Sequence, residues 1–550
     1  MRIRKNAVKV AAAASAGLVL GLVAQSTAHA NDAAIDACEA LGAVVVAGAR
    51  IVSANAVAAG RFVPTGTGAG GDVRQRAATL PGFCRVQARA APTPESDIGI
   101  EIWLPLKGWN GRFLGTGNGG GAGSIAYGMG MIEGLKRGFA VANTDMGVAP
   151  DIALADGYPE RWRDFGHRAT HEMTRVAKAL VRKYYEVTAF RSYFEGCSTG
   201  GQQALVTAQR YPDDYDGILA GAPGNNRTHS SSYFLWNYQA MNATPESRLS
   251  AAQWSMVSHA VLTACAGKDG GAPGDQFLTD PRRCNFDPAA LPQCQAHTVS
   301  DQCITQPQLA ALRRLYAGPV NPNTGERIYP GLTPGSEELP LGPARFSDRS
   351  LVSRLFVMRW GLGDAFSPDG FDFDRDMDRV DARLASSLNA NDSDLNNFAL
   401  HGGKLMLYSG LADPGVPFQD VVQYYDRVLS TSAVAGGRDF ARLFLIPGMG
   451  HCVGGPGATD IGQPFSSSVP PRTEGDALMA LVAWTEGGVA PEQIIARKAG
   501  GSDARAEERP VCAYPAFPEY RQGEVSKHDS FVCARHEQGS RQVPAARYLN

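Results

Sequence analysis

The chain has 550 residues, a formal net charge of −2, 44% hydrophobic residues and 19% charged residues. This near-neutral balance, with Lys and Arg scattered along the chain, gives no electrostatic basis for binding nucleic acid. The ten cysteines include no CxxC pair, and their spacing argues against a structural zinc site. An even number of cysteines is typical of an exported protein with disulfide bonds.

The first 30 residues predict a secretory signal peptide. A basic start at 1–5 precedes an apolar run at 8–24, and Ala28-His29-Ala30 matches a small-x-small cleavage site. A membrane anchor is the alternative, but it would need a longer apolar span. No other stretch is long and apolar enough to cross a bilayer. We therefore expect export to the periplasm or the cell exterior, with no membrane partner.

The mature chain of about 520 residues is too long for one simple core, so we expect two domains or one domain with a large insertion. Strands are predicted at Asp97–Leu104, Arg112–Gly115 and Phe139–Asn143, where short apolar runs end in Gly-rich or polar turns. A helix is predicted at Thr170–Tyr184, because its apolar residues fall on one face. This alternation predicts an α/β sheet in the first part of the chain, residues 31–224.

The stretch Gly196-Cys197-Ser198-Thr199-Gly200 has the G-x-S-x-G form of a nucleophile elbow. A strand at Arg191–Glu195 precedes it, and a helix at Gln202–Arg210 follows it and stops at Tyr211-Pro212. In such a turn the serine stands on a sharp strand-to-helix corner, and the glycines leave room for the crowded backbone. Ser198 is therefore the predicted nucleophile. The alternative is a Cys197 thiolate, but exported thiols are usually oxidised.

A glycine-rich loop, Asn118-Gly119-Gly120-Gly121, follows the predicted strand at Arg112–Gly115. In α/β hydrolases the oxyanion hole takes one backbone N–H from the residue after the nucleophile and another from an early loop of this kind. Thr199 and Gly120 are the predicted donors. A flexible turn is the alternative interpretation of these glycines.

Residues 225–395 interrupt the α/β pattern. After a predicted strand at Gly217–Ala222 and Pro223, the chain becomes rich in Pro, Gly, Asn and Asp and contains four cysteines. The pattern resumes at Lys404–Tyr408, so residues 396–550 are the predicted second part of the sheet domain. We interpret 225–395 as an inserted lid domain that covers the active site. Within it, Arg359, Trp360 and Phe366 are candidates either for the pocket wall or for the core of the lid.

One lid segment, between Cys265 and Cys284, has a composition that suits calcium. It contains Asp269, Asp275 and Asp280 among glycine turns and backbone carbonyls, and calcium prefers six to eight oxygen ligands. The spacing does not match an EF-hand. The alternative is a polar loop closed by a disulfide.

Two further residues complete a predicted catalytic triad. The strand that begins at Lys404 runs into a turn that carries Asp413, and a strand at Arg442–Ile446 runs into a turn that carries His451. The order Ser198, Asp413, His451 is that of an α/β hydrolase. Serine needs a base to accept its proton, and the aspartate orients that base and stabilises its charged form. Cys452 follows His451, so a bond between Cys452 and Cys197 would join the two turns.

The paired residues Cys197-Ser198 and His451-Cys452, together with Asp413, resemble the CS-D-HC motif of the tannase and feruloyl esterase family. That family also includes mono(2-hydroxyethyl) terephthalate hydrolases. The resemblance extends from Cys38 to Cys533 and includes the lid stretches 315–319, 329–331 and 334–337. It implies an α/β-hydrolase sheet with a large, disulfide-braced inserted lid domain, which acts on small esters of aromatic carboxylic acids.

The resemblance also implies five disulfides and a structural calcium in the lid. The implied pairs are Cys38–Cys84, Cys197–Cys452, Cys265–Cys284, Cys294–Cys303 and Cys512–Cys533. The implied calcium ligands are Asp269, Asp275 and the carbonyls of Gly271 and Phe277. Where the family usually has an aspartate after the first lid cysteine, this sequence has Ala266, and two extra residues stand between Asp269 and Asp275.

The predicted function is that of an exported serine carboxylesterase of the feruloyl or galloyl type, which acts through an acyl-enzyme. A mono(2-hydroxyethyl) terephthalate hydrolase is the first alternative, but Thr199 and Val416 replace the glutamate and the aromatic residue of that group. A lipase or a peptidase on the same triad is another alternative, and so is a non-catalytic binding protein on a hydrolase scaffold. The sequence indicates neither the acid, nor the alcohol, nor the oligomeric state.

Overall fold

The computed structural model describes residues 32–65, 71–295, 300–352, 355–433, 437–466, 473–498, 507–535 and 542–549. The predicted signal peptide at 1–30 lies outside the described residues. Within the described part of the chain, no helix is both long enough and apolar enough to span a bilayer.

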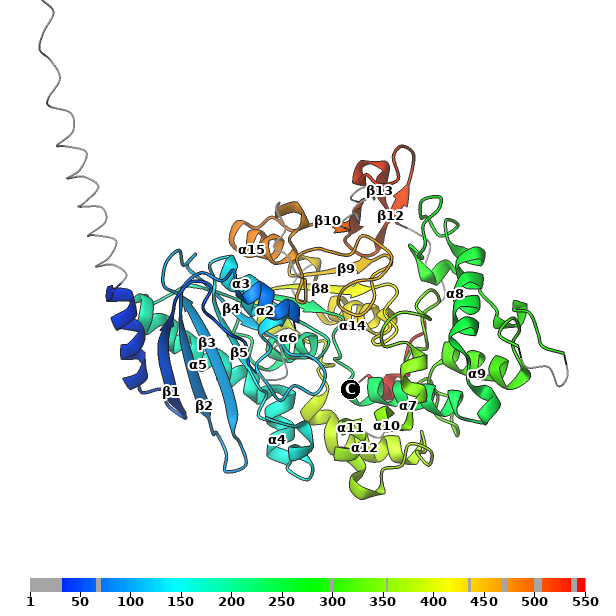
Figure 1. The fold of residues 1–550 in the computed structure, drawn as a ribbon, viewed down its shortest axis with the longest axis horizontal. Helices are drawn as coiled ribbons and strands as arrows, with labels where there is room; N and C mark the ends of the chain where they lie inside the picture. Colours follow the sequence, from blue (N-terminus) through cyan, green and yellow to red (C-terminus); the bar gives the residue numbers. More distant parts are fainter. Residues whose placement is uncertain are drawn as a thin grey trace, which may run out of the picture.

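A nine-stranded sheet runs through the middle of the molecule (Figure 1), in the order β1-β2-β3-β5-β4-β6-β7-β8-β9. Its first strands pair antiparallel, up to and including the contact of β3 with β5. From β5 to β9 all neighbours are parallel. The strands are β1 (Ala49–Val57), β2 (Phe83–Ala90), β3 (Ile98–Pro105), β4 (Arg112–Thr116), β5 (Ala140–Thr144), β6 (Arg191–Cys197), β7 (Gly217–Gly221), β8 (Lys404–Gly410) and β9 (Ala441–Ile446).

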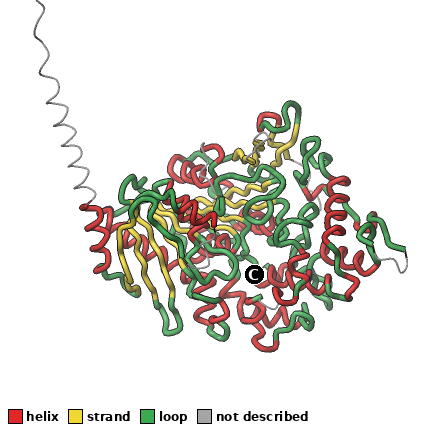
Figure 2. Tube along the Cα trace, viewed as in Figure 1, coloured by secondary structure: helices red, strands yellow, loops and turns green. Residues whose placement is uncertain are grey.

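Helices cover both faces of the sheet (Figure 2), because its inner strands are apolar on both sides. In β8, Leu405 and Leu407 belong to one core cluster, and Met406 and Tyr408 belong to the other. Successive side chains of a strand point to opposite faces of the sheet, so this alternation is expected for a strand that is buried on both faces. One face packs against α5 (Ala169–Tyr185), α6 (Thr199–Arg210) and α14 (Phe418–Thr431), and the other against α2 (Gly71–Ala77), α3 (Ile132–Lys136) and α15 (Ala477–Gly487).

The predicted strands from Asp97 to Ile446 are present in the structure, with their ends shifted by one or two residues in most cases. The elbow helix α6 begins at Thr199, three residues before the predicted start, because Gly200 and Gly201 are helical rather than part of the turn. The strand β3 is buried throughout, although it contains a glutamate. Its Glu101 is paired with Arg85 at 2.8 Å.

The segment 222–403 stands between β7 and β8 and consists mainly of helices. Two of them, α8 and α9, form a lobe at the edge of the molecule (Figure 1). Its small core includes Trp254, Val257, Leu309 and Leu312 and extends to the end of α7. The helices of this insertion are α7 (Arg227–Met241), α8 (Ala251–Cys265), α9 (Gln306–Ala317), α10 (Arg349–Val352), α11 (Phe356–Leu362), α12 (Arg375–Leu388) and α13 (Asn396–Leu400). The predicted lid boundaries, 225 and 395, both fall inside this segment.

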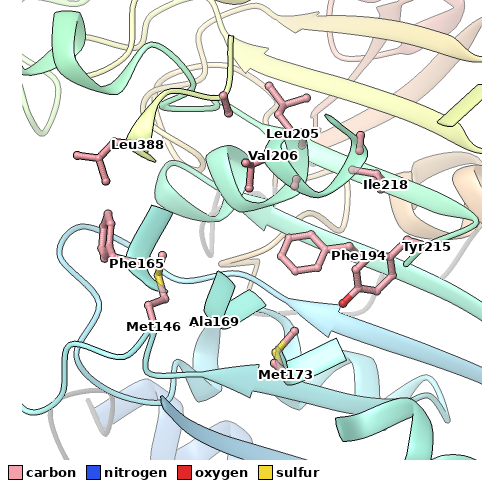
Figure 3. Packing of buried hydrophobic residues seen from close by; sticks show 14 of the residues in the cluster. Met146, Phe165, Ala169, Met173, Phe194, Leu205, Val206, Tyr215, Ile218 and Leu388 are labelled. Atoms are coloured by element: carbon pink, nitrogen blue, oxygen red, sulfur yellow. The ribbon is translucent and has the colours of Figure 1, made fainter. Parts of the chain in front are cut away.

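The rest of the insertion shares the main core of the protein. Figure 3 shows Leu388, the last residue of α12, in the same cluster as Leu205 and Val206 of α6. Phe165 belongs to this cluster as well. It lies in the π-helical segment Asp164–Arg168, which follows the short helix α4 (Pro159–Arg163). The insertion therefore has an outer lobe with a separate core and an inner part that is continuous with the sheet domain.

The C-terminal part of the chain adds two small antiparallel sheets. They pair β10 (Gln493–Lys498) with β11 (Glu507–Cys512), and β12 (Ala516–Tyr520) with β13 (Phe531–Arg535). Tyr514 donates a backbone hydrogen bond to Leu443 of β9 at 2.8 Å, which attaches this region to the edge of the main sheet.

All ten cysteines are paired, and the five bonds are those that the family resemblance implies. Cys197 is therefore part of a disulfide, and the alternative in which it acts as a thiolate nucleophile is wrong.

Candidate active site

Ser198 stands on a strained corner between β6 and α6. Its backbone has φ 63° and ψ −119°, a region that residues with a side chain rarely adopt. The corner is also crowded, because a Cβ added at Gly196 would lie 2.4 Å from the carbonyl oxygen of Gly200. The glycines of the motif are therefore required by the close approach of strand and helix, as the elbow interpretation predicts.

Asp413 and His451 meet at the same edge of the sheet. Asp413 follows β8 and His451 follows β9, and His451 Nδ1 lies 2.8 Å from Asp413 Oδ2. The aspartate is fully buried, and its Oδ1 accepts hydrogen bonds from the backbone N–H groups of Gly415 at 2.7 Å and Val416 at 3.0 Å. These bonds hold the carboxylate against Nδ1, so that Nε2 is the ring nitrogen of His451 without a protein partner among the described residues.

The surroundings of His451 favour its protonated form. Burial lowers the pKa of the ring, but the charge of Asp413 and the hydrogen bond to it raise the pKa by more, so that it lies above the ordinary value. The positive charge of Arg227 opposes this shift weakly. A base of this kind is able to accept a proton from an alcohol and to hold it while the neighbouring carboxylate stabilises the cation.

Ser198 and His451 open into one pocket of about 230 Å³. The other lining residues are mainly apolar, and most of them come from the insertion. They include Phe234, Leu341, Phe346, Leu355, Phe356, Val357 and Val416. The pocket therefore combines two chemically active side chains from the sheet domain with a wall from the insertion, an arrangement typical of small-molecule sites.

The two predicted oxyanion donors lie close together. The hydroxyl of Thr199 donates a hydrogen bond to the carbonyl oxygen of Gly120 at 2.7 Å, and Gly120 lines the pocket beside Ser198. Gly120 has φ 57°, which favours glycine. Within the described residues, the backbone N–H groups of Thr199 and Gly120 have no protein acceptor. Both are therefore available to a negatively charged oxygen.

Of the candidate lid residues, none lines this pocket. Trp360 is buried in the core, where its ring packs against those of Trp162 and Phe165. Arg359 is half exposed and forms an ion pair with Asp156 at 2.5 Å, and Phe366 packs against the main core. The interpretation of these three residues as pocket wall is therefore wrong. Trp360 and Phe366 pack in the core, as the alternative predicts, whereas Arg359 is exposed and fits neither interpretation.

Sequence reasoning missed the residues that do form the wall. Arg227, Phe234 and Phe356 line the pocket, but nothing in their local sequence separates them from neighbours that are buried elsewhere. One signal was available for Arg227. It stands soon after the end of β7, at the carboxyl edge of parallel strands where Asp413 and His451 were correctly expected.

The predicted calcium ligands lie in one loop, but their carboxylates have other partners. An added Cβ at Gly271 would stand 3.2 Å from oxygens of both Asp269 and Asp275, so the two side chains converge. The carboxylate of Asp269 accepts backbone N–H groups from Gly271, Thr279 and Asp280.

Asp275 accepts the N–H of Ala272 at 2.8 Å and pairs with Arg509 at 3.2 Å. The other predicted ligand, the carbonyl of Phe277, belongs to the same loop. With amide donors on one carboxylate and a guanidinium on the other, these residues as arranged do not fit a calcium ion, which needs free oxygen ligands. Calcium binding stays a prediction, and the contacts favour a loop braced by Arg509.

Comparison with known proteins identifies the family. A family model described as "Tannase and feruloyl esterase" matches residues 84–349 and 365–534. The chain belongs to the tannase and feruloyl esterase family. It is therefore a carboxylic ester hydrolase, and its esterase relatives agree with this conclusion.

Two curated relatives of this family cover most of the chain. An uncharacterised esterase of Xanthomonas campestris pv. campestris is 36% identical over 549 residues, 92% of this chain and 92% of the relative. The probable feruloyl esterase B-2 of Aspergillus terreus is 32% identical over 440 residues, 78% of this chain and 82% of the relative.

Two solved structures have the same fold. Feruloyl esterase B from Aspergillus oryzae superposes with a TM-score of 0.81 at 27% identity, over 91% of this chain and 100% of the other. The tannin acyl hydrolase from Aspergillus niger superposes with a TM-score of 0.69 at 19% identity, over 92% and 95% of the two chains. The latter likeness concerns the fold alone.

Removing the Cys197–Cys452 bond should destabilise the protein and impair the site. We expect Cys197→Ser/Cys452→Ser to lower the free energy of unfolding by roughly 2 to 5 kcal/mol, because the bond closes a very long loop in the unfolded chain. Denaturant unfolding without reductant measures this loss. The matched control is Cys294→Ser/Cys303→Ser, which removes a bond across a separation of 9 residues rather than 255. Equal stability of the first variant and the native protein would contradict the prediction.

Chelation of calcium should leave the stability of the protein nearly unchanged, because Arg509 already neutralises Asp275. We expect EGTA to shift the Tm by less than the error of the measurement. Arg509→Met should lower the free energy of unfolding by roughly 3 kcal/mol, because it leaves a buried carboxylate without its partner. A fall in Tm on chelation that added calcium reverses would show instead that the loop binds the metal.

Proposed function

We propose that this chain is an exported serine carboxylesterase that hydrolyses esters of aromatic carboxylic acids through an acyl-enzyme. The observation that carries the proposal is the meeting of a strained Ser198 and a carboxylate-bound His451 at one mainly apolar pocket. Family membership agrees with ester hydrolysis, and the relatives named as feruloyl esterases favour an aromatic acid.

In the first half of the reaction, Ser198 forms an ester with the acyl group. Its Oγ attacks the carbonyl carbon of the substrate while Nε2 of His451 takes the hydroxyl proton. The carbonyl oxygen becomes an oxyanion, which the N–H groups of Thr199 and Gly120 are placed to receive. When the intermediate collapses, the bond to the alcohol oxygen breaks, and His451 returns the proton to the leaving alcohol.

In the second half, water releases the acid. His451 takes a proton from the water as its oxygen attacks the acyl carbon, and a second oxyanion forms in the same hole. Collapse breaks the bond to Ser198 Oγ, which recovers its proton from His451. In both halves Asp413 keeps the ring in the tautomer that exposes Nε2 and stabilises the transient imidazolium.

The pocket suits an acyl group with one ring. Its wall includes Phe234 and Phe346, whose rings are stacked with centroids 4.2 Å apart, and Phe356 from α11. Aromatic rings prefer stacked or edge-on contact with other rings, which adds to the free energy of burial. A volume of about 230 Å³ accommodates a compact group of this kind.

Export agrees with the cysteine chemistry of the chain. Five disulfides join all ten cysteines. Such bonds form and persist in oxidising compartments and are rare in the cytosol. Together with the signal peptide that the sequence predicts, they support action in the periplasm or outside the cell.

Hydrolysis of an ester panel by the mature chain tests the function directly. The panel contains methyl ferulate, methyl gallate, mono(2-hydroxyethyl) terephthalate and a p-nitrophenyl alkanoate. We expect the highest kcat/KM on an aromatic-acid ester. Ser198→Ala should lower turnover by at least about 10⁴-fold with an unchanged Tm, because the acyl-enzyme cannot form. Ser192→Ala, at the other end of β6, is the matched control. A folded native enzyme that cleaves no member of the panel would contradict the proposal.

The pH profile should report the raised pKa of His451. The base must be neutral to accept a proton, so kcat/KM should rise with pH and reach half its plateau above about 6.5, the ordinary pKa of histidine. Asp413→Asn removes the charge that raises the pKa, so the midpoint should fall and kcat should drop by about 10⁴-fold. Asp381→Asn is the control, since Asp381 pairs with His229 instead. A midpoint that Asp413→Asn leaves in place would exclude His451 as the titrating base.

A further inference from the structure

Arg227 places a positive charge in the wall of the pocket. It is the first residue of α7, and it lines the pocket together with Ser198, Gly120 and His451. Among the described lining residues it is the one Lys or Arg, and no Asp or Glu is present. The pocket is thus largely apolar, and Arg227 is the one permanently charged side chain among its described lining residues.

The contacts of this guanidinium satisfy it only in part. Its Nη2 donates to the carbonyl oxygen of Gly120 at 3.0 Å. Its Cζ lies 5.6 Å from the ring centroid of Phe165 and 5.2 Å from that of Phe356, both within range of a cation–π interaction. Within the described part of the chain it has no carboxylate partner. Burial lowers the pKa of Arg227 to about 10, so the side chain is still charged at neutral pH.

A charged group with little solvent and no counter-ion is unfavourable until an anion reaches it. The planar fork of a guanidinium matches a carboxylate and is able to bind it through two parallel hydrogen bonds. Arg227 is partly exposed, and it lines the pocket. The remaining N–H donors of Arg227 are therefore accessible to a ligand in the pocket.

We propose that Arg227 binds a carboxylate carried by the substrate, so that the preferred substrates are aromatic esters with a free carboxylate. The inference rests on the proposed esterase function and specifies its substrate class. The carboxylate belongs either to the acyl part or to the alcohol part of the ester. In both cases the substrate brings the same negative charge into the pocket beside Ser198. The apolar wall then holds the ring while Arg227 selects the anion.

A purely structural role for Arg227 makes a different prediction. Its bond to Gly120 also supports the loop that carries an oxyanion donor. If positioning of that loop were its whole role, loss of the guanidinium would lower kcat for every ester alike. Recognition of a carboxylate instead changes the ratio of kcat/KM between a charged ester and its neutral counterpart.

Two matched pairs of esters test the proposal on the native enzyme. Monomethyl terephthalate and methyl 4-carbamoylbenzoate differ in the charge of the acyl part. Caffeoylquinate and the methyl ester of its quinate carboxylate differ in the charge of the alcohol part. Release of caffeate measures the hydrolysis of both. We expect the charged member of one pair to have a kcat/KM higher by about 10- to 100-fold, as for a hydrogen bond to a charged group. The pair that shows the preference locates the carboxylate.

Substitution of Arg227 should then remove the preference. Arg227→Met should bring the two members of that pair to within about twofold of each other, and Arg227→Lys should keep part of the preference because it retains the charge without the fork. The matched control is Arg314→Met. Arg314 also lies over an aromatic ring, because its Cζ is 4.5 Å from the ring centroid of Trp236, but it does not line this pocket. Its loss should leave the ratio of kcat/KM between the charged and the neutral ester unchanged.

If the native enzyme had equal kcat/KM for the two members of each pair, the proposal would be overturned. This measurement uses the native enzyme alone, so it does not depend on whether a variant folds. A preference that persists in Arg227→Met would also overturn it. In either case hydrolysis of the neutral esters would show that the esterase function stands. If the folded native enzyme cleaved none of the four esters, the esterase function itself would fail, and the assignment of Arg227 would fail with it.

Discussion

One covalent bond joins the turn that carries Ser198 to the turn that carries His451. The Cys197–Cys452 disulfide spans 255 residues and attaches directly beside both side chains. Between them, β7 and β8 hold β6 and β9 at fixed spacing through parallel hydrogen bonds. The strained backbone of Ser198 persists because the surrounding contacts leave the corner no other conformation. The predicted nucleophile and the predicted base are thus held in a fixed relation.

The sheet and the insertion supply different parts of the site. Loops at the carboxyl edge of the sheet hold Ser198, Asp413 and His451. The insertion supplies Phe234 and Phe356, which shape the pocket. Because the inner part of the insertion shares the main core, the pocket wall is packed against the sheet domain.

Much of the sheet and the pairing of Asp413 with His451 could be predicted from the sequence, because parallel strands are short apolar runs whose ends meet at one edge. The antiparallel strands β1 and β2 and the C-terminal sheets lack such runs, and their pairing is not local. The residues of the pocket wall could not be predicted from the sequence either. Phe356 lines the pocket and Trp360, one turn later on α11, fills the core, although both have the same apolar character. Arg509 contacts Asp275 from 234 positions away, which no spacing rule reveals.

The outer lobe of the insertion has a small core and two disulfides within its own stretch of chain, Cys265–Cys284 and Cys294–Cys303. Because this core is distinct from the core of the sheet, local opening of the lobe is expected to cost less free energy than global unfolding. Amide protons of α8 and α9 would then exchange with solvent by a different route from those of β6. Local opening of the lobe would then leave the corner on which Ser198 stands in place.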